Sequence, residues 1–132
     1  MADLPNLSGV KVLVVEDDPD TVEVTVAALR RCGASVWSAT VAEEARPLLT
    51  EVVPDVVICD LALPKEDGIA FVRWLRTQPL QSGGSAAVIA YTAYDGHFSR
   101  AVQSDSRFTA IVKKPADPGY VCTVVADLVR RP

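Results

Sequence analysis

Three carboxylates stand where apolar segments of the sequence end, and their positions suggest a shared site. Glu16 and Asp17 follow the run Val10–Val15, and Asp60 follows the run Asp55–Cys59. Two like charges about 4 Å apart repel by roughly 4 kcal/mol at a protein-surface dielectric, so such acids need a counter-charge or must point apart. Converging carboxylate oxygens suit a hard divalent cation such as Mg2+, which takes one or two carboxylates and commonly helps to bind a phosphoryl group.

Two further acids, Asp18 and Asp20, have a simpler interpretation. Asp18-Pro19 offers an N-cap followed by a proline at the first helical position. Acidic residues are favoured near a helix N-terminus in any protein. We therefore interpret Asp18 and Asp20 as helix-capping residues, and we keep Glu16 and Asp17 as candidate metal ligands because Asp60 is placed independently.

A hydroxyl and an ammonium group follow two later apolar segments. Thr92 comes directly after Ala86–Tyr91, and Lys114 comes shortly after Thr109–Val112. Alone, a threonine after a strand is usually a cap or turn residue, and a lysine is usually a solvated surface charge. Together with three acids at one edge of a sheet, they form a specific constellation.

The elements that must position these residues are five short strands alternating with five helices. The strands are predicted at Val10–Val15, Ser35–Ala39, Asp55–Cys59, Ala86–Tyr91 and Thr109–Val112. The first helix is predicted to begin at Pro19 and to be followed by a C-terminal cap at Gly33, and the second to begin at the capping-box pattern Thr40-Val41-Ala42-Glu43. The others are predicted over Ile69–Thr77, at about 97–104 and at about 118–130. Pro47 is expected to kink or shorten the second helix.

This alternation predicts a doubly wound α/β fold with a five-stranded parallel sheet and helices on both faces. Right-handed crossovers leave few topologies, of which the flavodoxin-like order 2-1-3-4-5 is common at this size. Ligands of such sheets bind outside the carboxyl ends of the strands, between the first and the third. Glu16, Asp17 and Asp60 end those two strands.

Composition and charge exclude several classes of protein. The 132 residues suit one domain, and the net charge of −4, without a basic cluster, argues against a nucleic-acid partner. No apolar stretch approaches the roughly 20 residues that a membrane helix needs, and the N-terminus has no signal-like run. Cys32, Cys59 and Cys122 lack metal-ligand spacing and are expected to be buried free thiols. We therefore expect a cytoplasmic protein.

Four separated motifs resemble one family, the response-regulator receiver domains of bacterial two-component signalling. They are VLVVEDDP, PDVVICDLALPKEDG, VIAYTA and IVKKP, in the family's order and spacing, with Pro64 and Gly68 four and eight residues after Asp60. The resemblance covers about residues 10–129 and implies a single receiver domain over 1–132. No glycine-rich phosphate loop follows any strand, which excludes a flavin or dinucleotide protein of similar topology.

The resemblance implies a role for each candidate residue. Asp60 would accept the phosphoryl group, and Mg2+ would be held by Glu16, Asp17, Asp60 and the backbone carbonyl of Ala62. Thr92 would hydrogen-bond the phosphoryl oxygens, and Lys114 would pair with them. The phosphoryl group would come from a phosphohistidine of a sensor kinase or a phosphotransfer protein. The chain would then be an acceptor that signals through a changed surface, and not a turnover enzyme.

The signal is expected to leave through the face formed by the helix at about 97–104, the last strand and the last helix. On that face Ile111 stands where the family usually has a tyrosine or phenylalanine that moves inward, and isoleucine has no phenolic group and is stiff at χ1. Tyr91 or Tyr94 could compensate. An alternative function is an interaction module that keeps the receiver fold and docks without phosphorylation; the intact acids, Thr92 and Lys114 argue against it.

Overall fold

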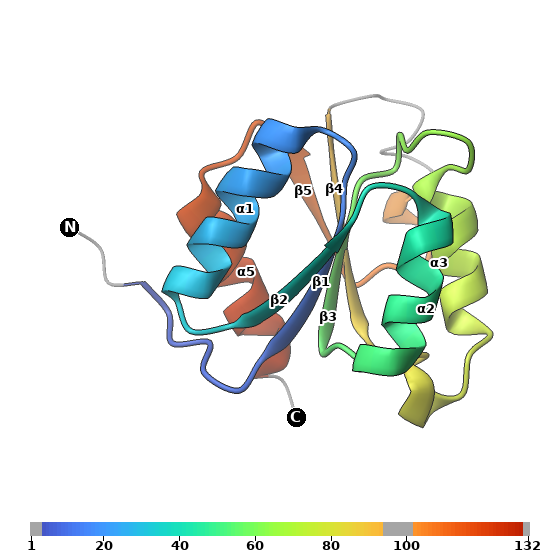
Figure 1. Cartoon of the computed structure of the whole chain (residues 1–132), viewed down its shortest axis with the longest axis horizontal. Helices are drawn as coiled ribbons and strands as arrows, with labels where there is room; N and C mark the ends of the chain where they lie inside the picture. Colours follow the sequence, from blue (N-terminus) through green and yellow to red (C-terminus); the bar gives the residue numbers. More distant parts are fainter. Residues whose placement is uncertain (1–3, 94–101, 131–132) are drawn as a thin grey trace.

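The computed structural model describes residues 4–93 and 102–130 (Figure 1). The five strands form one sheet in which every neighbouring pair is parallel, in the order β2-β1-β3-β4-β5. They are β1 (Lys11–Val15), β2 (Ser35–Ala39), β3 (Val56–Cys59), β4 (Ala87–Ala93) and β5 (Ala110–Lys114). The predicted fold and strand order are therefore confirmed.

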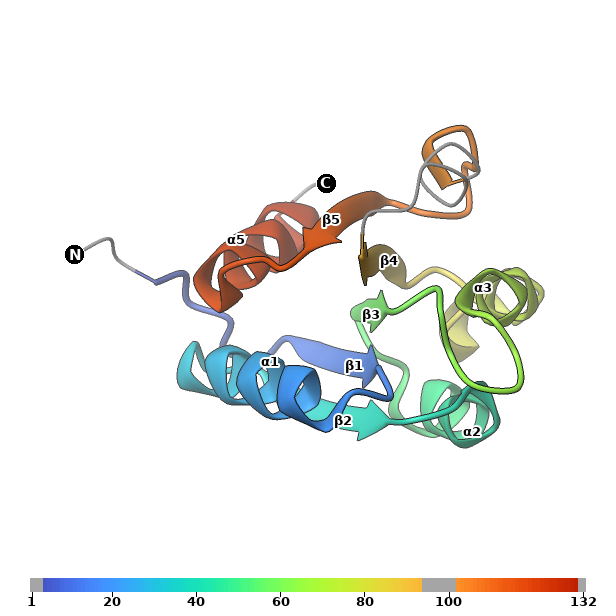
Figure 2. The ribbon, with the colours of Figure 1, turned by 90° about the horizontal axis from the view of Figure 1, so that it is seen from above.

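Helices cover both faces of the sheet. The described residues form α1 (Pro19–Arg31), α2 (Ala42–Val52), α3 (Gly68–Arg76), the short 3-10 helix η1 (Leu80–Ser82) and α5 (Pro118–Val129). Seen from above, α1 and α5 lie on one side of the sheet and α2 and α3 on the other (Figure 2). The helix predicted at about 97–104 lies mostly outside the described residues, which include only its end, where Val102 and Gln103 are helical.

The core has two main parts because side chains alternate along each strand. Val12 and Val14 of β1 pack with Leu29 of α1 and the buried face of α5. Leu13 and Val15, on the opposite face, pack against α2 and α3. Burial on both faces explains why the central strands are apolar throughout. None of the described helices is long and apolar enough to span a membrane.

The predictions made for the N-termini of α1 and α2 were partly correct. Asp18 caps α1 as predicted, with its Oδ2 accepting from the Thr21 N–H at 3.1 Å. The N-cap of α2 is Val41 instead of Thr40, and Thr40 donates to the carboxylate of Glu44 through its N–H at 3.1 Å and its hydroxyl at 2.7 Å. The predicted pairing of Thr40 with Glu43 was therefore one residue early.

Pro47 does not end α2, which continues to Val52. A proline lacks one N–H, so only one carbonyl of the helix loses its usual donor. The buried face of the helix, which includes Ala45 and Leu49, packs on the sheet on both sides of Pro47. This packing offsets the lost hydrogen bond, a tertiary effect that the local sequence does not reveal.

The last two strands are longer than predicted. β4 extends to Ala93 and β5 to Lys114, because Thr92 pairs with Lys113 and Ala93 pairs with Lys114. Each extension provides the hydrogen-bonding partner of the other. Thr92 and Lys114 therefore belong to the strand ends themselves, at the carboxyl edge of the sheet where they were expected.

Candidate functional site

The acids that end β1 and β3 meet over the carboxyl edge of the sheet. Val15 pairs with Cys59, so Glu16 and Asp60 follow neighbouring positions, and the Asp60 N–H donates to the Val15 carbonyl at 2.9 Å. Glu16 is 2% exposed and Asp60 is 7% exposed, whereas Asp17 is exposed. One carboxylate oxygen from each of the three acids lies within 4.8 Å of the others.

Lys114 supplies the counter-charge that this group of acids needs. Its Nζ lies 3.0 Å from Asp60 Oδ2 and also donates to Glu16 Oε1. The side chain of Lys114 is 18% exposed, so the ammonium and both carboxylates are largely shielded from water. Shielding strengthens their attraction. The repulsion between Glu16 and Asp60 is thus offset from β5, at the other end of the sequence.

Burial and hydrogen bonding affect the protonation of these groups differently. Burial raises the pKa of Glu16 to about 6, against the lowering effect of the hydrogen bonds from Lys114 and from the Asp18 N–H. Burial also raises the pKa of Asp60, but the N–H of Ala62 and Lys114 outweigh it and hold this pKa below its usual value. Burial lowers the pKa of Lys114, yet the hydrogen bonds to both acids outweigh it and the pKa lies above its ordinary value. The metal-free site therefore keeps Asp60 ionised.

The backbone after β3 orients the carboxylate of Asp60. The Ala62 N–H donates to Asp60 Oδ1 at 3.0 Å while Lys114 binds Oδ2, so both oxygens of the carboxylate are held. Sequence reasoning had singled out Ala62 for its carbonyl and missed its N–H. The role of the Ala62 carbonyl as a metal ligand stays a prediction.

Thr92 reaches the same edge of the sheet and is 5% exposed. Among the described contacts, its hydroxyl makes no hydrogen bond with Asp60 or Lys114. Tyr94, the other candidate for an aromatic switch beside Tyr91, lies outside the described residues. Ile111 is half-buried and packs in a small cluster around Leu61, Ala90 and Val102.

Asp18 and Asp20 are not part of the acid group of Glu16, Asp17 and Asp60. The carboxylate of Asp18 faces Thr21, whose hydroxyl and N–H lower the pKa of Asp18. The Asp18 N–H donates to Glu16 Oε2 at 3.1 Å and so helps to orient Glu16. The interpretation of Asp18 as a capping residue is confirmed.

Tyr91, named above as one residue that could compensate for the missing aromatic switch, contacts Lys114 from the neighbouring strand. The Lys114 Nζ lies 5.4 Å from the centroid of the Tyr91 ring. Such a cation–π contact contributes about 0.5–2 kcal/mol, depending on how well it is shielded from water. Tyr91 therefore helps to keep the ammonium beside the two carboxylates.

We expect Tyr91→Leu to lose this contact and Tyr91→Phe, which keeps the ring, to retain most of it. Urea unfolding of each variant, alone and combined with Lys114→Met, gives the coupling energy between the two positions. The expected coupling is about 1 kcal/mol for the Tyr91→Leu cycle and much less for the Tyr91→Phe cycle. Equal coupling in both cycles would show that the ring does not hold Lys114.

Comparison with known proteins identifies the family of the chain. The family profile of the response regulator receiver domain matches residues 12–126. An uncharacterised 14.6 kDa protein of Leptolyngbya boryana is 35% identical over 115 residues, which cover 87% of this chain and 86% of that protein. Protein Rrf1 of Nitratidesulfovibrio vulgaris is 32% identical over 115 residues, which cover 87% of this chain and 79% of that protein.

Longer regulators and solved structures are also similar. The transcriptional regulatory protein PhoP of Bacillus subtilis is 31% identical over 92% of this chain, which spans 49% of that protein. A crystal structure described as a response regulator from Chloroflexus aurantiacus superposes with a TM-score of 0.80 at 27% identity, covering 96% of this chain and 99% of that one. The chemotaxis response regulator CheY4 of Vibrio cholerae, at 22% identity, shares the fold with a TM-score of 0.81 over 90% of this chain and 98% of its own. The chain therefore belongs to the response regulator receiver domain family of two-component signalling.

Proposed function

We propose that this receiver domain accepts a phosphoryl group on Asp60 from a phosphohistidine of a sensor kinase or a histidine phosphotransfer protein. The observation that carries the proposal is the environment of Asp60. Its carboxylate is buried, ionised and held on both oxygens, at 3.0 Å from the Ala62 N–H and 3.0 Å from Lys114 Nζ. Two further acids stand beside it. A purely structural aspartate would need the hydrogen bonds and the counter-charge, but not two further acids beside it.

The donor set beside Asp60 fits Mg2+. Glu16, Asp17 and Asp60 offer carboxylate oxygens within 4.8 Å of one another, and two of the three acids are buried. Hard oxygen ligands with access to water on one side are what Mg2+ prefers, and exposed Asp17 lies on the open side. We assign these three acids, with the Ala62 carbonyl, as the residues that would hold the ion. Mg2+ bound there would neutralise negative charge on the phosphoryl group as it is transferred.

Four residues of the chain would take part directly in the transfer of the phosphoryl group. An oxygen of Asp60 forms the new bond to phosphorus while the bond from phosphorus to the histidine nitrogen of the partner breaks. The Ala62 N–H fixes the rotation of the carboxylate, and Lys114 balances the charge that develops on the transferred group. We assign the hydroxyl of Thr92, at the end of the adjacent strand, as a hydrogen-bond donor to the phosphoryl oxygens. Asp60 ends the step as an acyl phosphate, so the protein is an acceptor and not a turnover enzyme.

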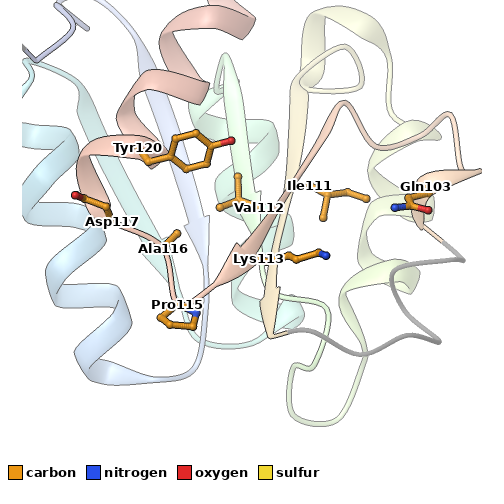
Figure 3. A pocket seen from close by; sticks show the side chains of 8 residues that line it. All are labelled: Gln103, Ile111, Val112, Lys113, Pro115, Ala116, Asp117 and Tyr120. Atoms are coloured by element: carbon orange, nitrogen blue, oxygen red, sulfur yellow. The ribbon is translucent and has the colours of Figure 1, made fainter.

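We place the output on the face formed by β5 and α5, together with the end of the helix at residues 102–103. A hollow of about 580 Å³ lies on this face, between Ile111 and Lys113 of β5, Tyr120 of α5 and Gln103 (Figure 3). Tyr120 is 56% exposed, and its side chain lines the hollow. An exposed aromatic side chain is a common anchor for a protein partner. The downstream target would bind here.

We further propose that the protein works in the reducing cytoplasm and that its partners are proteins. Cys32, Cys59 and Cys122 are buried and free, as was predicted, which suits a reducing compartment. Burial raises the pKa of Cys122 to about 12, so this thiol is unreactive. The net charge of −4 supports a protein partner over a nucleic acid.

The direct test is intact-mass measurement of the protein after incubation with a small-molecule phosphodonor such as acetyl phosphate. We expect one phosphoryl group per chain when Mg2+ is present and almost none when a chelator removes it. If Mg2+ and the donor leave the mass unchanged, the phosphorylation-independent interaction module becomes the better function.

Mg2+ is expected to stabilise the protein, and Asp17→Ala should reduce that effect. An ion that binds only the folded state adds RT ln(1 + [L]/Kd), or about 1.4 kcal/mol at ten times Kd. Without metal, Asp17→Ala should be slightly more stable than the wild type, because repulsion from Glu16 and Asp60 falls. Thermal unfolding with and without Mg2+ measures both effects. If Mg2+ raises the melting temperature of both proteins equally, Asp17 is not a ligand.

A further inference from the structure

The loop from Leu61 to Asp67, which leads from β3 into α3, carries Ala62 past the site and is anchored at both ends. At its start, the Ala62 N–H donates to Asp60 Oδ1 at 3.0 Å. At its end, the Gly68 N–H donates to the Leu61 carbonyl at 2.8 Å, which brings the two ends of the loop together. Leu61 and Leu63 are buried and fix the inner side of the loop. The outer side needs a separate support.

The outer part of the loop, around Lys65, has a backbone conformation that its residue types do not favour by themselves. Lys65 has a φ of 69°, in the left-handed region that side chains with a Cβ disfavour. The next residue, Glu66, donates its N–H to the Pro64 carbonyl at 2.7 Å in a tight turn. Such a conformation persists when contacts from elsewhere in the protein hold it.

That contact comes from Arg46 of α2. Arg46 Nη2 lies 2.5 Å from Glu66 Oε2, and the guanidinium carbon lies 5.3 Å from the centroid of the Trp74 ring in α3. The Trp74 ring is itself fixed by Phe71, with ring centroids 5.9 Å apart. The side chains of Arg46 and Glu66 are 31% and 33% exposed, so the pair is partly shielded. Figure 2 shows the loop running beside α2 before it turns into α3.

The planar guanidinium is suited to this place because it can bind a carboxylate at its edge and an aromatic ring at its face. An isolated surface ion pair contributes little to stability. Arg46 of α2, however, contacts both the loop, through Glu66, and α3, through Trp74, and both lie well after α2 in the sequence. Its effect should therefore appear in the position of the loop more than in the overall stability.

We propose that Arg46 is a positioning residue, which holds the β3–α3 loop through Glu66 so that the backbone of Ala62 faces Asp60 and the proposed ion. This inference rests on the proposed function of the site. Glu66 is four residues from Ala62 in a loop closed by the Gly68–Leu61 hydrogen bond, so a shift at Glu66 is transmitted to Ala62. Arg46 itself contacts neither Asp60 nor any of its described partners.

The test compares Arg46→Gln with the wild type in two measurements. The first, without metal, is the amide chemical shift and hydrogen exchange of Ala62 by NMR; the Ala62 signal should move and its exchange should accelerate in the variant. The second is a Mg2+ titration followed by the same amides. The affinity should fall about tenfold, as is typical when a residue supporting a metal ligand is lost.

Two more variants distinguish positioning from general destabilisation. Arg31→Gln removes an exposed arginine of α1, far from the loop, and should leave both measurements unchanged. Arg46→Lys keeps the charge but not the planar group, so it should restore only part of the Mg2+ affinity. A full recovery would contradict the role of the Trp74 contact.

The outcomes separate this inference from the proposed function. If Arg46→Gln matches the wild type in both measurements, Arg46 does not position the loop. If the wild type binds no Mg2+, the proposed metal site fails, and the metal-free Ala62 signal still decides the inference: a moved signal supports it and an unmoved signal overturns it.

Discussion

Asp60→Asn is expected to abolish phosphorylation of the protein. The amide that replaces the carboxylate has no anionic oxygen to attack phosphorus, and the other two acids of the site, Glu16 and Asp17, are assigned to holding the proposed ion and not to accepting the phosphoryl group. Asparagine has nearly the same size, and its oxygen can still accept from the Ala62 N–H. The variant should therefore fold normally and lose only the chemistry. Intact-mass measurement after incubation with Mg2+ and acetyl phosphate should show no phosphorylated fraction.

A matched control is Asp20→Asn, which removes one carboxylate from the exposed first turn of α1 near the site. This variant should be phosphorylated as fully as the wild type, because Asp20 does not belong to the acid group. An undiminished phosphorylated fraction in Asp60→Asn would refute the assignment. Peptide mapping of that product would then locate the true acceptor.

The fold could be predicted because its main signals are local. Each central strand is a short apolar run, and turn or capping residues separate the runs, so the period and length of each run identify its type. Asp18-Pro19 marked the beginning of α1 for the same reason. The ends of β4 and β5 were misplaced because they depend on each other: Ala93 and Lys114 are strand residues only because they pair. A single-sequence pattern contains no information about such a partner.

The sequence predicted which residues of the candidate site lie at one edge of the sheet, but not which of them contact one another. Topology alone brings the ends of neighbouring parallel strands to one edge, and this was enough to gather Glu16, Asp60, Thr92 and Lys114. It did not reveal that Lys114 binds Glu16 as well as Asp60, a contact between residues 98 positions apart. That contact explains how a chain can end a buried strand with adjacent acids.

The residues that hold the loop after Asp60 in place were the hardest part of the site to predict from the sequence. The Arg46–Glu66 pair joins residues 20 positions apart, and each of them alone looks like an ordinary helix or loop charge. Their partnership depends on how α2 packs beside the β3–α3 loop, which the sequence pattern of either segment does not specify. Gly68 is a similar case, since its spacing from Asp60 was visible in the sequence but its physical reason was not.

Gly68→Ala is expected to destabilise the protein strongly and to disturb the phosphoacceptor. A Cβ at Gly68 would lie 2.3 Å from the Asp60 carbonyl oxygen, 2.9 Å from the Leu61 Cα and 3.0 Å from the Cys59 Sγ. The two nearest atoms belong to the backbone, so no side-chain rotation can relieve the clash. Either α3 or the loop after Asp60 must move, at a cost of about 3 kcal/mol or more. The Gly68 N–H, which donates to the Leu61 carbonyl, would move with it.

Urea unfolding with Gly9→Ala as the control separates this clash from the ordinary effect of replacing a glycine. Gly9 has a φ of 83° but open space where a Cβ would be, so its replacement should cost only the backbone strain, about 1–2 kcal/mol. Gly9→Ala should keep normal phosphorylation, because Gly9 lies before β1 and away from the acids. Gly68→Ala should lose more stability than Gly9→Ala and should also be phosphorylated more slowly at a temperature where it is folded. If Gly68→Ala loses no more stability than Gly9→Ala and is phosphorylated at the normal rate, the close approach of α3 to Asp60 has no role in holding the site.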